Sequence, residues 1–416
     1  MLKFIFLRVM TRFLLVLLIL FTFTTAFTQD ITVRGVIVDA ETGDPVPFAH
    51  IGVCGKALGT VANENGVYRL TVPGYALQDT LCASAIGYTK YKKAIKDVAG
   101  EKLDIHLEPE TSVLDEVLIK DAKVTARRVI RKAVNKIRKN YPRNPFQLKG
   151  YYRDYLKNGP DYISFLEAAV VIEDPGFDKD DDKSVIGINQ MRYSDNYVKY
   201  FKEYVREFDK DTTKILIHGI SPVFRGNELS NMRFHNPIRN YMESVPFIGD
   251  FITFYEKNYD FTIAYYTYVD GEEVYVIDIK PRAEYRFHHV KVEGKLFIRV
   301  KDYAILKFNY AYFVTKRLDT RKWYELNLEY KSFEGTMYLK YISYMNYYKI
   351  FTLGEIVDMF QYREFFVNDI ETGDLEPIPQ ESRINPIKPL YVQEAPNDPD
   401  FWRSYNRTML EQPLKE

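Results

Sequence analysis

Between Leu148 and Phe351 the chain alternates apolar and polar residues over long stretches, and this alternation constrains the fold more than any other feature. Within 323–333 (WYELNLEYKSF), residues 324–331 alternate strictly: Tyr324, Leu326, Leu328 and Tyr330 share one face of a strand, and Glu325, Asn327, Glu329 and Lys331 share the other. A period of two predicts strands with one buried and one polar face. The 34 Tyr and 28 Phe among 416 residues agree, since aromatic side chains suit a half-buried pleated surface.

Eight strands of this kind are predicted, at 151–156, 163–174, 261–269, 273–281, 289–302, 304–314, 323–333 and 337–351. Turn signals such as Asp270-Gly271 and Glu334-Gly335 join them, and such short connections predict antiparallel neighbours. We therefore expect a larger α+β domain at 146–370, built on an antiparallel sheet that can curve into a half-barrel. Its middle, 175–260, is less regular and includes a helix-like stretch near 195–210.

The Pro-rich segment 371–416 has few periodic runs. We predict an extended strap that crosses the surface of the larger domain. A short ordered end is expected near Trp402 and Tyr405, because large aromatic side chains favour burial.

Residues 1–28 have the pattern of a secretory signal peptide. A basic head with Lys3, Arg8 and Arg12 precedes an apolar run from Phe13 to Phe23 and small residues up to Ala26. The uninterrupted apolar run is shorter than the roughly 18 residues that span a bilayer. We predict cleavage near 26–28 and export of the mature chain; an uncleaved anchor is the alternative.

Residues 29–120 are predicted to form a small β-sandwich. Short alternating runs separated by turn clusters amount to seven strands, in 31–40, 47–55, 59–73, 79–95, 102–109 and 113–120. Asn65-Gly66 lies between two alternating runs and predicts a hairpin, because both residue types tolerate a positive φ.

Three segments of this region resemble the carboxypeptidase-like regulatory domain, which is a transthyretin-like or immunoglobulin-like sandwich. They are RGVIVDAETGDPVPFAHIGV (34–53), GTVANENGVYRLTVP (59–73) and the turn Ser84–Tyr88. The resemblance implies an exported protein of Bacteroidetes-type Gram-negative bacteria, located in the periplasm or outer membrane. There the domain often precedes TonB-dependent receptors, and 114–117 (LDEV) is similar to the segment that follows it.

The remaining 296 residues, 121–416, are too few for the plug and barrel of such a receptor. They resemble instead the uncharacterised body that follows this domain in other exported proteins. That resemblance implies no activity.

Cys54 and Cys82 both fall in strand-like segments of the predicted sandwich. An oxidising compartment permits a disulfide between them. Two buried free thiols on opposite faces are equally compatible with the sequence.

Residues 121–145 are predicted to contain one amphipathic basic helix that ends at Tyr141-Pro142. Its apolar stripe consists of Ala126, Val129, Ile130, Ala133, Val134 and Ile137. Its basic face consists of Arg127, Arg128, Arg131, Lys132, Lys136, Arg138 and Lys139. The favoured interpretation docks the stripe on a sheet and leaves the basic face in solvent. The alternative is peripheral contact with anionic lipid head groups.

We assign no catalytic, cofactor-binding or metal-ligating residue from the sequence. No His is followed three residues later by Glu, so the zinc pair of carboxypeptidases is missing. The other candidates fail on spacing or direction: the acidic run Asp178, Asp180 and Asp182, the pair His288-His289, and Ser221 near His218. The 57 positive and 57 negative side chains balance and give no reason to expect nucleic-acid binding.

The leading hypothesis is an exported, non-enzymatic cell-envelope protein that acts as a binding or assembly module. Its partner would be an envelope protein, a glycan or a lipid-like ligand. One alternative is a small outer-membrane β-barrel with a periplasmic sandwich domain. Another is a hydrolase without a short motif, whose two carboxylates need only be close in space. The aromatic side chains of 341–350 (YISYMNYYKI) exceed what one core face needs and are candidates to line a groove.

Overall fold

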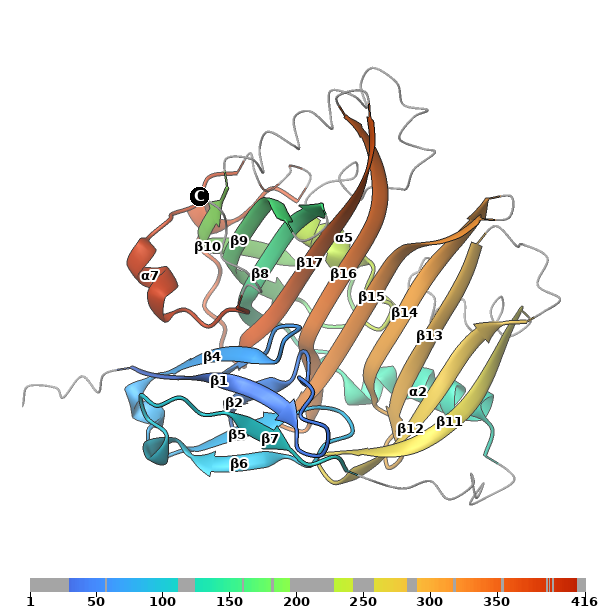
Figure 1. The fold of residues 1–416 in the computed structure, drawn as a ribbon, viewed down its shortest axis with the longest axis horizontal. Helices are drawn as coiled ribbons and strands as arrows, with labels where there is room; N and C mark the ends of the chain where they lie inside the picture. Colours follow the sequence, from blue (N-terminus) through green and yellow to red (C-terminus); the bar gives the residue numbers. More distant parts are fainter. Residues whose placement is uncertain are drawn as a thin grey trace, which may run out of the picture.

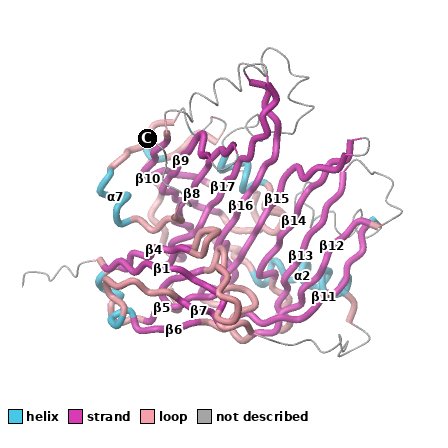
Figure 2. The backbone as a smooth tube through the Cα atoms, viewed as in Figure 1, coloured by secondary structure: helices cyan, strands magenta, loops and turns pink. Residues whose placement is uncertain are grey.

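The computed structural model describes residues 30–56, 58–110, 124–158, 161–180, 183–194, 228–241, 258–282, 290–316, 319–352, 355–386, 388, 390 and 393–409. Several predictions fall outside these residues: the signal peptide, the strand at 113–120, the helix-like stretch near 195–210, Asp182, His218, Ser221 and His288-His289. Within them the chain is mainly β, with strands filling most of the tube in Figure 2. The predicted mainly β class is confirmed.

The N-terminal strands form two small sheets, with the orders β4-β1-β7 and β3-β2-β5-β6. The strands are β1 (Ile31–Asp39), β2 (His50–Val53), β3 (Gly59–Val61), β4 (Val67–Val72), β5 (Thr80–Ser84), β6 (Tyr91–Ala94) and β7 (Ile105–Leu107). Short 3-10 turns lie at η1 (Gly74–Ala76) and η2 (Ile95–Asp97). Apolar side chains of both sheets, among them Ile37, Ile51 and Leu81, pack into one shared core. We call this unit the N-terminal sandwich.

The turn at Asn65-Gly66 forms, but the predicted hairpin is wrong. Gly66 has φ +71°, as a tight turn requires. The strands that flank it pair elsewhere, β3 with β2 and β4 with β1. The turn therefore carries the chain from one sheet to the other, and the Asn65-Gly66 signal specified the turn without specifying the partners of its strands.

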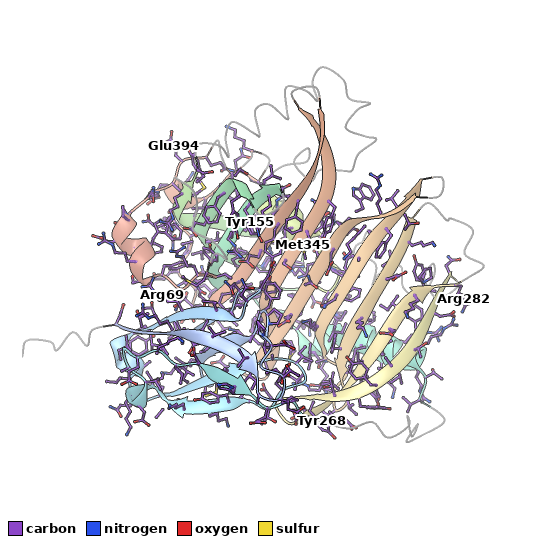
Figure 3. All side chains as sticks on the ribbon, viewed as in Figure 1. Arg69, Tyr155, Tyr268, Arg282, Met345 and Glu394 are labelled. Carbon is purple, nitrogen blue, oxygen red and sulfur yellow. A yellow bond between two sulfur atoms is a disulfide. The ribbon has the colours of Figure 1, made fainter. Side chains whose placement is uncertain are left out.

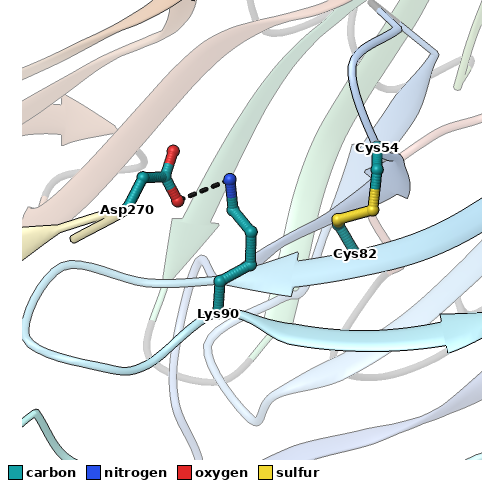
Figure 4. The surroundings of a disulfide bond; sticks show 4 residues. All are labelled: Cys54, Cys82, Lys90 and Asp270. Carbon is teal, nitrogen blue, oxygen red and sulfur yellow. Dashed lines mark ion pairs between the residues drawn. A yellow bond between two sulfur atoms is a disulfide. The ribbon is translucent and has the colours of Figure 1, made fainter.

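Cys54 and Cys82 form a disulfide within the four-stranded sheet (Figure 4). Cys82 lies on β5, and Cys54 directly follows β2, its neighbour in that sheet. The pairing of these two strands brings the Cα atoms to 5.2 Å, which decides between the two alternatives that the sequence left open.

The predicted amphipathic helix is α2 (Ala126–Asn140), and it ends before Tyr141-Pro142 as expected. Thr125 caps its first turn by accepting a hydrogen bond from the backbone N–H of Arg128, at 3.4 Å. The whole predicted stripe packs into the main core, with Val134 partly buried and its other members fully buried. No helix in the described part of the chain is long and apolar enough to cross a membrane.

Ten antiparallel strands form the large sheet, in the order β10-β9-β8-β17-β16-β15-β14-β13-β12-β11. They are β8 (Phe146–Asn158), β9 (Asp161–Asp174), β10 (Val185–Tyr193), β11 (Tyr259–Val269), β12 (Glu272–Pro281), β13 (Val290–Arg299), β14 (Ile305–Lys316), β15 (Asp319–Phe333), β16 (Thr336–Thr352) and β17 (Glu355–Thr372). The sheet consists of two meanders, β8 to β10 and β11 to β17, joined where β17 pairs with β8.

Two of these strands were not predicted. The supposedly irregular region 175–260 contains β10, and β17 extends beyond the last strand counted in the sequence. In β17, Phe365, Phe366 and Val367 are all fully buried, because both faces of the sheet are covered there. A strand buried on both sides loses the period of two that reveals other strands.

The two faces of the large sheet are covered by different parts of the chain (Figure 1). The rear face packs against α2 and α5 (Glu228–Phe234). The front face contacts the N-terminal sandwich and the C-terminal segment with η6 (Gln380–Ser382) and α7 (Pro399–Ser404). This C-terminal segment runs along the edge strand β10, where the backbone N–H of Ile384 donates to the carbonyl of Ile186 at 2.9 Å.

Candidate functional site

A row of polar side chains crosses the front face of the large sheet, each directly opposite the next on a neighbouring strand. In order from β9 to β12, the row consists of Glu167, Arg153, Glu364, Ser343, Asn327, Asn309, Lys295 and Asp278. We call it the polar row. On the rear face, the neighbouring residues of the same strands, such as Leu166, Leu328 and Phe308, are buried in the main core. The alternation of apolar and polar residues in single strands thus gives the whole sheet an apolar rear face and a continuous row of polar side chains on its front face.

Arg153 and Glu364 form an ion pair at the buried end of the row. The guanidinium Nη2 and the carboxylate Oε1 are 2.8 Å apart, and the two side chains are 5% and 0% exposed. The hydroxyls of Tyr341 and Tyr362 each donate to the other carboxylate oxygen at 3.1 Å. A buried charge needs such partners, because an unpaired one costs several kcal/mol.

Glu167, at the end of the row, is held in a similar way. The Tyr151 hydroxyl donates to its Oε2 at 2.6 Å, and Arg192 contacts its Oε1. Arg407 of the C-terminal segment approaches Oε2 at 3.6 Å. Both buried carboxylates of the row are therefore acceptors for arginine and tyrosine donors.

A small crevice opens beside Arg153, where three distant parts of the chain meet. The sandwich contributes Phe48, Asn63 and Glu64, the sheet contributes Arg153, Tyr155, Tyr162 and Tyr362, and the C-terminal segment contributes Met409. Its volume of about 10 Å³ holds one water-sized group. Arg153 Nε is buried and has no hydrogen-bond partner within the described structure. The crevice therefore has mostly aromatic walls and is lined in part by a guanidinium whose Nε has no partner in the described structure.

Aromatic side chains continue from the crevice along the front face. Figure 3 places Tyr155 and Met345 on this face, above the sandwich. The Tyr155 ring centre is 5.1 Å from those of both Tyr162 and Tyr362, and Tyr347, which is 37% exposed, lies 5.4 Å from Phe360. Together, Tyr155, Tyr162, Met345, Tyr347, Phe360 and Tyr362 form what we call the aromatic platform.

The tyrosines singled out in 341–350 divide between the two faces. Tyr341 and Tyr347 lie on the front face, next to the ion pair and in the aromatic platform respectively. Tyr344 lies on the rear face, where it stacks on His235 with ring centres 5.1 Å apart. Burial, followed by the charge of Arg363, lowers the pKa of His235 to about 4. Core packing accounts for Tyr344, whereas Tyr347 faces outward.

A larger cleft lies elsewhere on the sheet, near the start of the C-terminal segment. Its volume is about 760 Å³. Its lining is mostly polar: Gln147, Lys149, Val171, Asn189, Ile370, Glu371, Thr372, Asp374, Glu376, Pro377, Ile378 and Pro379. Lys149 pairs with Glu371, and Gln147 Nε2 donates to the carbonyl of Glu376 at 2.6 Å. Its size suits a small ligand, but Lys149, Glu371 and Gln147 are already engaged with groups of the cleft itself.

Titratable groups accumulate where the sandwich touches the sheet. Burial raises the pKa of Glu329, but the charges of Lys307 and Lys340, at 2.7 Å and 3.1 Å, bring it down to about 2. Burial and the charge of Lys340 lower the pKa of Lys331 to about 7. The His50 side chain is partly buried, with its Nε2 atom fully so, and this burial moves its pKa well below the usual value.

The structure gives other roles to the acidic and polar residues singled out in the sequence. Asp178 pairs with Arg138 and Arg143, and Asp180 with Lys183, so their carboxylates serve ion pairs. No cluster suited to a metal ion occurs among the residues that the structure describes. No local pattern predicts the Arg153–Glu364 pair, because its two residues are 211 positions apart in the chain.

Comparisons with known proteins match the two parts of the chain unequally. A segment of 94 residues, 23% of this chain, is 32% identical to the TonB-dependent receptor SusC of Bacteroides thetaiotaomicron and spans 9% of that receptor. Two solved structures align with 61% of this chain: a LolA superfamily protein of Nitrosomonas europaea (12% identity, TM-score 0.23, 96% of its length) and a DUF1329 family protein of Desulfovibrio piger (10%, 0.25 and 95%). Such low scores assign no common fold. Residues 33–119 match the CarboxypepD_reg-like domain family, so the N-terminal sandwich is a CarboxypepD_reg-like domain.

Proposed function

We propose that this protein is an exported, non-enzymatic binding module of the cell envelope that recognises a glycan on the front face of its large sheet. The observation that carries the proposal is the crevice, which is lined by Arg153 and by Tyr155, Tyr162 and Tyr362, together with the buried Arg153 Nε that has no hydrogen-bond partner within the described structure. Aromatic faces stack on the apolar faces of sugars, and a planar polar side chain binds their hydroxyl groups. A single hydroxyl fits the volume of the crevice.

The charge balance of the site supports a neutral ligand. Arg153 is neutralised by Glu364, so its remaining donor favours a hydroxyl or carbonyl oxygen over a full negative charge. The sugar ring itself would lie outside the crevice, on the more exposed rings of Tyr162, Phe360 and Tyr347. Since the apolar rear face is packed against α2 and α5 where it is described, the front face supports a glycan better than a lipid-like ligand.

Binding is better supported than hydrolysis. Glu167 and Glu364 lie on the same face, as a pair of catalytic carboxylates would. Each of them already accepts hydrogen bonds from tyrosine and contacts arginine, which supports a role in positioning. The envelope location rests on the predicted signal peptide, the resemblance stated above and the similarity of the N-terminal sandwich to part of a TonB-dependent receptor.

The test is an array of neutral and acidic oligosaccharides probed with the mature chain, followed by titration of the best binder by calorimetry. Tyr162→Ala and Tyr347→Ala should each weaken binding by about two- to tenfold, the effect of one lost stacking contact. Tyr75→Ala is the matched control, because Tyr75 is 73% exposed and lies on the sandwich, outside the aromatic platform. The proposal fails if no glycan binds, or if Tyr75→Ala weakens binding as much as the platform variants do.

A further inference from the structure

Helix α2 presents a surface of a single charge sign on the rear of the molecule. Its 15 residues include no Asp or Glu. Six of its cations are exposed and Arg127 is partly buried. The exposed ones are Arg128, Arg131, Lys132, Lys136, Arg138 and Lys139.

Part of this charge is used within the molecule. Arg138 pairs with Asp178 at 3.1 Å, and the Lys132 ammonium lies 4.6 Å from the Tyr303 ring centre. Arg128, Lys136 and Lys139 form no ion pair within the described structure. Together with Lys132 they recur at intervals of four, four and three positions, so they lie along one line of the helix surface. All four side chains are exposed, and no carboxylate of the described residues pairs with Arg128, Lys136 or Lys139.

We propose that this line of cations binds the phosphate-bearing head groups of an anionic membrane surface. The distance from residue 128 to residue 139 corresponds to about 16 Å of helix, a span that covers several lipid head groups. Each Lys or Arg near an anionic surface is worth about 1 kcal/mol. Three or four such charges give reversible attachment that weakens with salt.

The packing of α2 determines how the surface would be contacted. Its apolar stripe is already buried against the sheet, so no apolar face remains to enter the acyl region. Contact is therefore electrostatic and peripheral. With the helix toward the membrane, the front face with its crevice points away from it (Figure 1).

The experiment is co-sedimentation of the mature chain with vesicles of phosphatidylcholine alone and with vesicles containing equal parts of phosphatidylglycerol. We expect binding to the anionic vesicles, loss of binding at high salt, and little binding to phosphatidylcholine. Arg128→Gln combined with Lys136→Gln should weaken partitioning about 30-fold, since each lost cation accounts for about fivefold. Both side chains are exposed, so circular dichroism of the variant should match that of the parent chain.

The matched control is Lys92→Gln combined with Lys93→Gln. These two exposed lysines lie on β6 of the sandwich, and their loss changes the net charge by the same amount. Equal weakening by the two double variants would overturn the proposal, because it would show a response to net charge alone. Equal binding to both kinds of vesicle, or tighter binding to duplex DNA than to anionic vesicles, would overturn it as well. The glycan test above does not involve α2, so either proposal can fail without the other.

Discussion

Partly buried charged residues on the front face are stabilised by partners from neighbouring strands. Glu329 on β15 lies between Lys307 on β14 and Lys340 on β16. All three are polar positions of strands whose other face fills the core, so the alternation that buries Leu328 also brings the three charges together. The energy of the arrangement depends on Glu329 being ionised.

We predict that Glu329 contributes to acid sensitivity. Its folded-state pKa of about 2 lies below the ordinary value of 4.5, so its contribution is fully present above about pH 4.5 and is lost as the pH falls to about 2. Glu329→Gln should therefore cost about 3 kcal/mol at neutral pH and almost nothing near pH 2. Urea unfolding at a series of pH values measures this difference.

The neighbouring Glu325 provides the control. It lies on the same strand and face and pairs with Lys322 at 2.8 Å, but both side chains are partly exposed, at 25% and 38%. Glu325→Gln should change stability by less than about 1 kcal/mol at any pH. A cost of Glu329→Gln that stayed constant between neutral and acid pH would contradict the assignment.

At the scale of elements, the disulfide joins adjacent strands of the sandwich, which has a modest core of its own. Cys54 and Cys82 are 28 positions apart, and the strands β2 and β5 are already paired by backbone hydrogen bonds. The covalent link thus adds no new contact to the folded sandwich. Its effect is to restrict the unfolded chain.

We predict that replacing both cysteines by alanine lowers the stability of the sandwich by about 3.6 kcal/mol, the value for a closed loop of this length. Calorimetry of the mature chain, with and without a reducing agent, measures the change. The reducing agent should destabilise the parent chain and leave Cys54→Ala/Cys82→Ala unaffected. If the parent chain were insensitive to reduction, a stabilising role of the disulfide would be refuted.

At the scale of the whole molecule, the C-terminal segment forms hydrogen bonds with both the sandwich and the large sheet and so connects them. Asn406 forms two hydrogen bonds with the backbone of Thr71 on β4, at 2.7 Å and 2.9 Å. The adjacent Tyr405 hydroxyl donates to the carbonyl of Gly150 on β8 at 2.8 Å. Trp402 is buried beside Tyr151. The other contacts between the sandwich and the large sheet are smaller. Val61 packs against Tyr341 and Phe366, and Lys90 forms an ion pair with Asp270 at the surface (Figure 4).

We predict that Asn406→Leu separates the unfolding of the sandwich from that of the sheet. The change leaves the buried backbone N–H and carbonyl of Thr71 without partners, which costs about 1–3 kcal/mol for each group. Calorimetry should then show two transitions in place of one, and X-ray scattering a larger radius of gyration. Arg403→Ala is the control, because Arg403 contacts Arg69 through its backbone carbonyl and its side chain is 78% exposed. Unchanged scattering by Asn406→Leu would show that the other contacts suffice.

Much of the fold could be predicted from local patterns, and most of the candidate site could not. The alternation in 323–333 correctly assigned Leu326 and Leu328 to the core and Asn327 to the opposite face. The apolar stripe of α2 was equally clear. By contrast, β17 was missed although it supplies Glu364 and Tyr362 to the site, because its residues are buried on both faces. Tyr347 belongs to 341–350, the segment predicted to supply groove-lining aromatic side chains, but its outward position depends on which strands lie beside it.

The sequence by itself determined which segments are strands and which is a helix, where apolar residues repeat with the period of that element. This repeat follows from the geometry of strands and helices and can be recognised in residues that are close together in the chain. The sequence also determined the resemblance of 34–53 and 59–73 to a known domain. The tertiary structure decided which strands are neighbours: the partners of the strands around Gly66, the pairing of Cys54 with Cys82, and the meeting of β8 with β17 that sets Arg153 against Glu364. Such pairings depend on the joint burial of segments far apart in the chain, and no local pattern records them.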